Sequence, residues 1–280
     1  MTLRKLDKSE HDKTRQLWED VFKEDTKAFL DYYYSVKTAE NEIYVIEEDD
    51  KIVSMLHLNP YQMRIGEKLY QTHYIVAVAT DEAYRKRGYM AQLLNHAMQV
   101  MAERKEPFTF LMPAAEAIYK PFGFHFIYEQ KQANVRGKQY KGDAVSLYLA
   151  EEKDCKEIAD YTNEMLQDYD VVTWRDEYYY RTLLQEQASE EGGILIAREA
   201  EKIVGVFCFA KGERVELREP LFDKEELLQY AIYTITGNET EEVHCTGYGT
   251  QTTPMIMAKI LQPDMLEDFQ GMKVFINEVV

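Results

Sequence analysis

The residues best suited to chemistry form a basic stretch that follows an apolar run. Residues 74–80 indicate a buried strand, Arg85, Lys86 and Arg87 follow a short turn, and Gly88 precedes a long helical pattern. A helix N-terminus offers unpaired backbone N–H groups and a partial positive charge, and glycine lets the backbone approach a ligand closely. The spacing therefore predicts a site for a pyrophosphate or a similar anion, although a solvated basic turn would show the same residues.

The rest of the composition limits the partners of such a site. The 280 residues carry 33 Lys and Arg against 50 Asp and Glu, a formal charge of −17, so three adjacent cations are unusual here. The acidity argues against a nucleic-acid partner and favours cationic or neutral small molecules, although it also serves ordinary solubility. The phosphate motifs GxxxxGK[ST] and GxGxxG are both absent from the sequence.

Other chemistry is disfavoured. Cys155, Cys208 and Cys245 are widely spaced, with no CxxC and no histidine pair at ligand spacing, so we expect neither a disulfide scaffold nor a metal site. The first residues are polar throughout, and no apolar run approaches the roughly 18 residues of a membrane span. We therefore expect no signal peptide, no membrane interaction and a cytoplasmic protein.

Hydrophobic periodicity predicts the elements that hold the basic stretch in place. In the first half we expect strands at 2–6, 42–47, 52–58, 61–65, 69–80 and 108–112, and helices at 9–22 (with Ser9 as N-cap), 27–35, from Gly88 to about 103, and at 115–120. In the second half we expect strands at 144–149, 193–197 and 203–210, and helices at 153–166 and 175–186.

Short echoes link the two halves. Asp31-Tyr-Tyr-Tyr34 resembles Glu177-Tyr-Tyr-Tyr180, and Lys51-Ile-Val53 resembles Lys202-Ile-Val204. Both pairs are about 150 residues apart and fall in the same order between similar elements, which favours an internal repeat. We therefore expect two copies of one α+β unit.

The strand, basic loop and helix resemble motif A of the GNAT acetyltransferase superfamily, whose pattern is [RQ]xxGx[GA] and whose ligand is acetyl-CoA. Residues 108–112, followed by a segment ending in Tyr119-Lys-Pro-Phe-Gly-Phe124, resemble its motif B. Together they look more narrowly like the enhanced-intracellular-survival (Eis) branch, which has two tandem GNAT units and then a sterol-carrier-like domain. Met90 fits that branch, which typically has an apolar residue where most GNATs have Gly or Ala.

The resemblance implies an α+β fold of two tandem GNAT-like units, each a mixed sheet flanked by helices, with a short C-terminal appendage. Residues 1–140 would be the catalytic unit, 141–250 a degenerate unit, and 251–280 a truncated sterol-carrier-like segment of strand, helix and strand. In the second unit, acidic residues at 215–226 replace the basic loop, so no cofactor is expected there. The appendage is too short for its own core and must pack on the rest of the chain or on a neighbouring subunit.

The resemblance also assigns roles to residues of the first unit. Val78, Ala79 and Thr80 would present backbone groups to the pantetheine arm, and Ala114 and Ala115 would line the cofactor. The pyrophosphate would be held by a run of seven residues: Arg85, Lys86, Arg87, Gly88, Tyr89, Met90 and Ala91. Tyr119 would be the general acid that reprotonates the CoA thiolate, since a tyrosine pKa of about 10 lies near a thiol pKa of about 8.5.

The general base is left open. In the Eis branch the C-terminal carboxylate, here that of Val280, is thought to accept the amine proton; Glu116 is another candidate, and a water relay is a third. His57, His73 and His125 either face the acceptor groove or are structural. Trp18, Phe22 and Tyr32–Tyr34 either wall the acceptor pocket, where rings would suit an ammonium, or pack in the core.

These expectations favour direct transfer of acetyl from acetyl-CoA to a primary amine, because no cysteine lies near the two motifs to act as a covalent relay. The acceptor would be a cationic small molecule, aminoglycoside-like or a polyamine, or a lysine side chain. The alternatives are a non-catalytic acyl-CoA sensor or assembly module, and an aminoacyl transferase using charged tRNA, which the acidity disfavours. A homo-oligomer is left open, since relatives of the branch assemble into rings.

Overall fold

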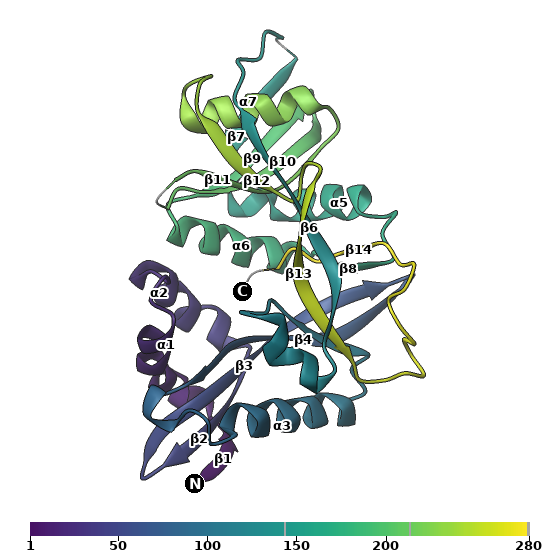
Figure 1. Ribbon diagram of the computed structural model, residues 1–280. Helices are drawn as coiled ribbons and strands as arrows, with labels where there is room; N and C mark the ends of the chain where they lie inside the picture. The colour runs from purple at the N-terminus through teal and green to yellow at the C-terminus, as the bar shows by residue number, and fades with distance from the viewer. Residues whose placement is uncertain (143, 213, 279–280) are drawn as a thin grey trace. The chain divides into compact units, whose positions relative to one another are not determined.

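The computed structural model describes residues 1–142, 144–212 and 214–278, and the chain divides into two compact units (Figure 1). The first unit contains residues 1–128, 170–173 and the C-terminal residues from 255 onward, and the second contains 129–169 and 174–254. The sequence prediction divided the chain instead near residues 140 and 250. The mixed sheets flanked by helices confirm the expected α+β class.

The sheet of the first unit has the strand order β1-β2-β3-β4-β5-β13-β6. Neighbouring strands from β1 to β4 pair antiparallel, β4 and β5 pair parallel, and β13 pairs antiparallel with β5. The strand bounds are β1 (Thr2–Lys5), β2 (Glu42–Glu48), β3 (Lys51–Ile65), β4 (Lys68–Thr80), β5 (Phe108–Leu111), β6 (His125–Arg136) and β13 (Gln251–Ile260). The long strands β6 and β13 each continue from one unit into the other.

Helices cover both faces of this sheet. Successive side chains of a strand point to opposite faces, so apolar residues on both faces are buried under helices. On β2, Ile43 and Val45 pack with α1 and α2, whereas Tyr44 and Ile46 pack with α3 on the opposite face (Figure 1). The helical bounds are η1 (Lys8–Thr14), α1 (Arg15–Val21), α2 (Lys27–Ser35), η2 (Lys37–Ala39), η3 (Glu82–Tyr84), α3 (Tyr89–Glu103), α4 (Glu116–Tyr119) and η4 (Lys120–Phe122). The predicted helix that follows Gly88 is confirmed.

Two local predictions in this unit were wrong. The helix expected at 9–22 is a 3₁₀ segment followed by α1, and its N-cap is Asp7 rather than Ser9, because Asp7 and Glu10 form a reciprocal capping box. The two strands expected at 52–58 and 61–65 are one strand, β3, which runs through Pro60. Proline is tolerated there because β2 ends opposite Leu58, so β3 has no β2 partner at Pro60.

The second unit repeats the plan with the strand order β7-β9-β10-β11-β12-β6. Helices α5 and α6 pack on one face, against Ile194 and Ile196, and α7 packs on the other, against Leu195 and Ala197. The bounds are β7 (Val145–Leu149), η5 (Glu152–Asp154), α5 (Cys155–Met165), α6 (Glu177–Ser189), β9 (Gly193–Glu199), β10 (Lys202–Ala210), β11 (Glu216–Phe222), α7 (Glu225–Thr236) and β12 (Glu242–Thr246).

Matched side-chain contacts support the internal repeat. The capping box of Asp7 and Glu10 has a counterpart in Glu151 and Asp154. The Tyr34 hydroxyl lies 2.8 Å from Thr14 Oγ1, and the Tyr180 hydroxyl donates to Thr162 Oγ1 over 2.9 Å. The two triple-tyrosine echoes therefore lie on equivalent helices, α2 and α6.

The C-terminal segment belongs to the sheet of the first unit. Met257–Ile260 pair with Leu111–Phe108 of β5, and β14 (Val274–Phe275) pairs parallel with β8 (Val171–Thr173). No helix occurs between β13 and residue 278, so the helix predicted after the opening strand was wrong. Apolar residues of β13, such as Met257, are buried against the core of the first unit, which supplies the packing that a separate small domain would lack.

Candidate active site

A gap in the first sheet begins where β4 and β5 diverge. The two strands pair at Tyr74 and Phe110, and β4 then runs on to Thr80, whereas β5 ends at Leu111. Along the other edge of β4 a bulge interrupts the pairing with β3 between Met55 and His57, and Ala77 lies within it at a φ of 50°. Such a bulge bends its strand and re-aims the backbone groups beside it.

Beyond the bulge, one edge of the β4 backbone has no strand partner among the described residues. The Asp81 N–H donates to the Val53 carbonyl over 2.9 Å, and Ser54 Oγ donates to the Ala79 carbonyl over 2.8 Å, so Ala79 and Asp81 face β3. Because backbone groups alternate along a strand, those of Val78 and Thr80 face the opposite edge, where β5 has diverged. Of the three residues predicted to meet pantetheine, Val78 and Thr80 offer backbone groups on this open edge.

The N-terminus of α3 lies just beyond this edge in the chain. Its N-cap is Gly88, at a φ of 79°, and no side chain caps the helix. A Cβ added at Gly88 would meet no atom within 4 Å, so the space in front of the helix is open. The first N–H groups of a helix have no partner within it, so those of Gly88, Tyr89, Met90 and Ala91 are available to an anion.

All three cations of the loop are exposed, but they are held differently. Arg85 Nε donates to the Thr80 carbonyl over 3.3 Å. Arg87 pairs with the Glu48 carboxylate at 3.2 Å and lies over the Tyr84 ring, while Lys86 makes no ion pair with the residues described. Glu48 also accepts a hydrogen bond from the Tyr89 hydroxyl, and sequence reasoning missed this residue because it lies on β2, far away in the chain.

Tyr119 ends α4 and is buried, with 7% of its surface exposed. It packs in the same apolar cluster as Tyr89, and Val78 and Met90 contact that cluster, so residues of the two motifs come together. Burial raises the pKa of Tyr119 to about 12. The group is therefore protonated at neutral pH, and it is a weaker acid than an exposed tyrosine.

The loop before α4 is open to solvent. Ala114 and Ala115 are exposed, as are the apolar side chains of Met112 and Ile118, at 47% and 40%. These residues could cover an apolar arm of a ligand. Glu116 is also exposed and pairs with Lys120 at 3.0 Å. The Val280 carboxylate, the other candidate base, lies outside the described residues.

The candidate histidines have three different surroundings. His125 is exposed at the start of β6, and His73 is buried with its Nδ1 2.9 Å from both carboxylate oxygens of Glu106. His57 is fully buried against the Trp18 and Tyr33 rings, and burial lowers its pKa to about 3. His57 is therefore neutral, and its packing among buried aromatic rings favours a structural role.

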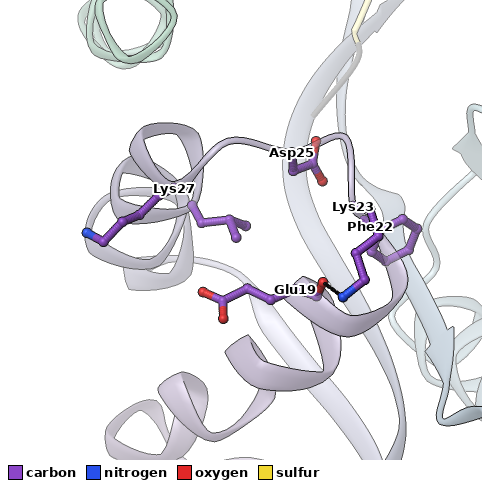
Figure 2. Close-up of a pocket in the computed structure, with 6 residues that line it drawn as sticks. Glu19, Phe22, Lys23, Asp25 and Lys27 are labelled. Atoms are coloured by element: carbon purple, nitrogen blue, oxygen red, sulfur yellow. Dashed lines mark hydrogen bonds between the residues drawn. The ribbon is translucent and has the colours of Figure 1, made fainter.

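The aromatic residues of the first helices are mostly core. Trp18 and Tyr32–Tyr34 are at most 8% exposed and pack over the sheet. Phe22 instead lines an open depression of about 430 Å³ between α1 and α2 (Figure 2). Its lining residues are Glu19, Phe22, Lys23, Asp25, Lys27 and Leu30. Carboxylates and ammonium groups both line it, so its local charge selects neither sign of ligand.

The second unit has a matching bulge, with a charged residue in it. A bulge between Val206 and Cys208 of β10 matches the first one, with Glu219 at a φ of 48° in the position of Ala77. Glu219 forms an ion pair with Arg175, and the two side chains are 13% and 2% exposed. At the start of α7, Lys224, Glu225 and Glu226 replace the basic glycine loop.

The described residues contain neither a metal-binding cluster nor a membrane-spanning helix. No group of three or more His, Cys, Asp or Glu side chains there could hold a metal ion. Across the described ranges, no helix is both long and apolar enough to cross a membrane.

Comparisons with known proteins agree with this geometry. Residues 2–127 match the family model of the acetyltransferase (GNAT) domain, and no curated protein matches the chain. A conserved protein of unknown function from Enterococcus faecalis is similar in structure, with a TM-score of 0.76 at 18% identity over 93% of this chain and 72% of that one. Eis1 from Mycobacterium abscessus has a TM-score of 0.65 at 8% identity, over 95% and 75% of the chains. A tandem GNAT protein from the clavulanic acid biosynthesis pathway has a TM-score of 0.59 at 11% identity, over 94% and 99%. These likenesses confirm the tandem fold; none of them supports a sterol-carrier-like appendage.

Proposed function

We propose that the first part of this chain, whose residues 2–127 match the family model of the GNAT acetyltransferase domain, transfers acetyl from acetyl-CoA to a primary amine. The observation that carries the proposal is the uncapped, exposed N-terminus of α3, with Arg85, Lys86 and Arg87 before it and open space at Gly88. An anion such as a pyrophosphate fits this arrangement, because N–H groups, helix dipole and side chains all favour negative charge.

The open edge of β4 extends the site away from the pyrophosphate. Val78 and Thr80 direct backbone groups toward the gap left by β5, where an amide-containing arm would pair like a short added strand. Ala114, Ala115 and the exposed apolar side chains near them would cover that arm. The thioester would then lie in the gap between β4 and β5.

The chemical step follows from the groups around the gap. A neutral amine attacks the acetyl carbonyl, the C–S bond breaks, and the Tyr119 hydroxyl donates its proton to the departing sulfur while the new amide nitrogen releases a proton to water. Because the pKa of Tyr119, about 12, lies above that of a free thiol, about 8.5, the proton transfer is uphill by itself. Reprotonation of the tyrosinate from water draws it forward, and the net products are the amide and the CoA thiol. All three cysteines belong to the second unit and are buried, which favours direct transfer over a cysteine-bound intermediate.

The acceptor in this proposal is cationic: an aminoglycoside-like compound, a polyamine or a lysine side chain. The support is the formal charge of −17, which would concentrate cations around the protein. The depression in Figure 2 is a candidate entrance, but its mixed lining adds nothing to the preference for a cation. A panel screen whose best substrate is neutral or anionic would contradict this part of the proposal.

The alternative is a non-catalytic acyl-CoA sensor or assembly module. It would need the α3 site but no acid, so the buried, protonated Tyr119 beside that site favours the enzyme. We also propose a cytoplasmic location, where free thiols such as the three here persist. The general base and homo-oligomer formation stay predictions.

Calorimetric titration of acetyl-CoA tests the site directly. We expect micromolar binding to the unaltered protein and at least tenfold weaker binding to the Arg85→Ala/Arg87→Ala variant, about 1.4 kcal/mol. A Lys224→Ala variant at the start of α7 is the control and should bind normally. Failure of the unaltered protein to bind acetyl-CoA would remove the proposal, and binding without turnover of any amine would favour the sensor.

A further inference from the structure

The core of the first unit contains a polar cluster that acetyl transfer does not use. Tyr33, Asn41, His57 and Asn59 are each at most 2% exposed, between α2 and the sheet. Asn41 Nδ2 donates to the Tyr33 hydroxyl over 3.1 Å and to Asn59 Oδ1 over 3.3 Å. The Tyr33 hydroxyl donates to Asn59 Oδ1 over 3.0 Å and lies 3.2 Å from His57 Nδ1.

The contacts of the Tyr33 hydroxyl are the basis for assigning a tautomer to His57. The hydroxyl has one proton and two acceptors within reach, and we assign the proton to Asn59 Oδ1, which lies nearer, at 3.0 Å against 3.2 Å for His57 Nδ1. His57 Nδ1 must then carry the hydrogen and donate it to the Tyr33 oxygen. The other ring nitrogen, Nε2, is left with a bare lone pair, since burial keeps the ring neutral.

Three polar atoms of this cluster remain without a partner among the described residues. They are His57 Nε2, Asn41 Oδ1 and Asn59 Nδ2, all fully buried. The first two are acceptors and the third is a donor. Leaving a buried polar atom unpaired costs free energy of folding, so a native core satisfies such groups, often with ordered water.

We propose that the cluster of Tyr33, Asn41, His57 and Asn59 is a binding site for internal water, held on the bare Nε2 of His57. One water molecule can donate two hydrogen bonds and accept others, which matches the two acceptors and one donor left over. Asn59 and His57 lie two residues apart on β3, so their side chains share one face of the sheet. His57 is the partner of Val76, next to the bulged Ala77, so the water stabilises β3 where it supports the bulge of β4.

Two measurements on the full chain test the proposal without any substitution. A crystal structure that resolves ordered water should show one within hydrogen-bond distance of His57 Nε2 and of Asn41 Oδ1 or Asn59 Nδ2. Nitrogen NMR of histidine-labelled protein should show a protonated Nδ1 and an unprotonated Nε2 for His57 at neutral pH. An empty site in the crystal, or a proton on Nε2, would overturn the proposal.

A matched pair of tyrosine variants checks the network. Tyr33→Phe removes the hydroxyl that fixes the ring, so both nitrogen signals of His57 should shift. Tyr34→Phe removes a neighbouring buried hydroxyl that bonds to Thr14 instead, and the His57 signals should stay in place. Equal responses to the two variants would refute the tautomer argument, and if Tyr33→Phe does not fold, the two measurements on unaltered protein decide.

Discussion

The two units share one backbone plan and differ where a thioester would lie in the first. Val76 and Arg218 occupy equivalent positions, opposite His57 and Cys208. In the first unit the parallel pairing of β4 with β5 ends earlier, at Tyr74, and leaves a gap between these two strands. In the second, β11 and β12 stay paired as far as Arg218, and Glu219 at the bulge forms an ion pair with the buried Arg175.

Two further replacements separate the copies. Residues 112–124 connect β5 to β6 and include α4 with Tyr119, whereas residues 247–250 suffice to connect β12 to β13. Glu225 and Glu226 complement the N-terminal dipole of α7, so that helix has less need of an external anion than α3 has. The comparison teaches that a sheet, its bulge and its helices can be retained while a few local changes remove a binding site.

We expect the largest effect from a change at Tyr119, the proposed general acid, which lies in the longer connection, residues 112–124. Tyr119→Phe should lower kcat by about 10²–10⁴ while acetyl-CoA binding is retained, because the variant loses a proton donor but little packing. Steady-state kinetics and calorimetry measure the two quantities. Tyr248→Phe, in the short connection of the second unit, removes a hydroxyl that bonds Glu225 and should leave kcat unchanged. Equal losses of kcat in both variants would contradict the assignment of the general acid to Tyr119.

The ion pair of the second unit should matter for stability rather than activity. Glu219→Ala leaves the buried Arg175 without its carboxylate and should destabilise the second unit by about 3–5 kcal/mol. Hydrogen exchange of β10 and β11 in increasing urea measures this loss. Glu177→Ala, which breaks an exposed pair with Arg181, is the control and should cost about 0.3–0.5 kcal/mol. A loss no larger than the control would mean that the pair does not hold this region together.

Acid should weaken the first unit more than the second through the residues beside their bulges. The pKa of His57 is lowered from 6.5 to about 3, so between these values the unfolded chain binds a proton that the native chain does not. The free energy of unfolding should therefore fall by about 1.4 kcal/mol per pH unit as the pH drops below 6.5. Cys208, in the matching position, has its pKa raised by burial and takes up no proton in this range.

Hydrogen exchange of β3 and β10 at pH 7 and pH 5 measures the two units separately. His57→Cys gives the first unit the residue of the second and should reduce the pH dependence of β3 by about 2 kcal/mol over that interval. An unchanged pH dependence in this variant would show that other groups cause the acid sensitivity.

Local sequence signals predicted much of the fold but little of the difference between the two units at their bulges. The apolar face after Gly88 and the triple tyrosines on α2 gave correct helices, because each pattern repeats within a few residues. The bulge at Ala77 has no such signal, since an alanine with positive φ is set by the neighbouring strand. The pairs of Arg175 with Glu219 and of Tyr33 with His57 join distant segments, which one sequence does not reveal.

The place of β13 beside β5 has a consequence for synthesis on the ribosome. The partner residues Leu111 and Met257 emerge roughly 150 residues apart, which at about 5–20 residues per second is a delay of about 7–30 s. Until then the edge of β5 has unpaired N–H and C=O groups, the kind of edge that recruits other chains into aggregates. The sheet of the first unit is therefore completed only after residues 257–260 have been translated, and a fragment ending near residue 140 would have an unfinished sheet.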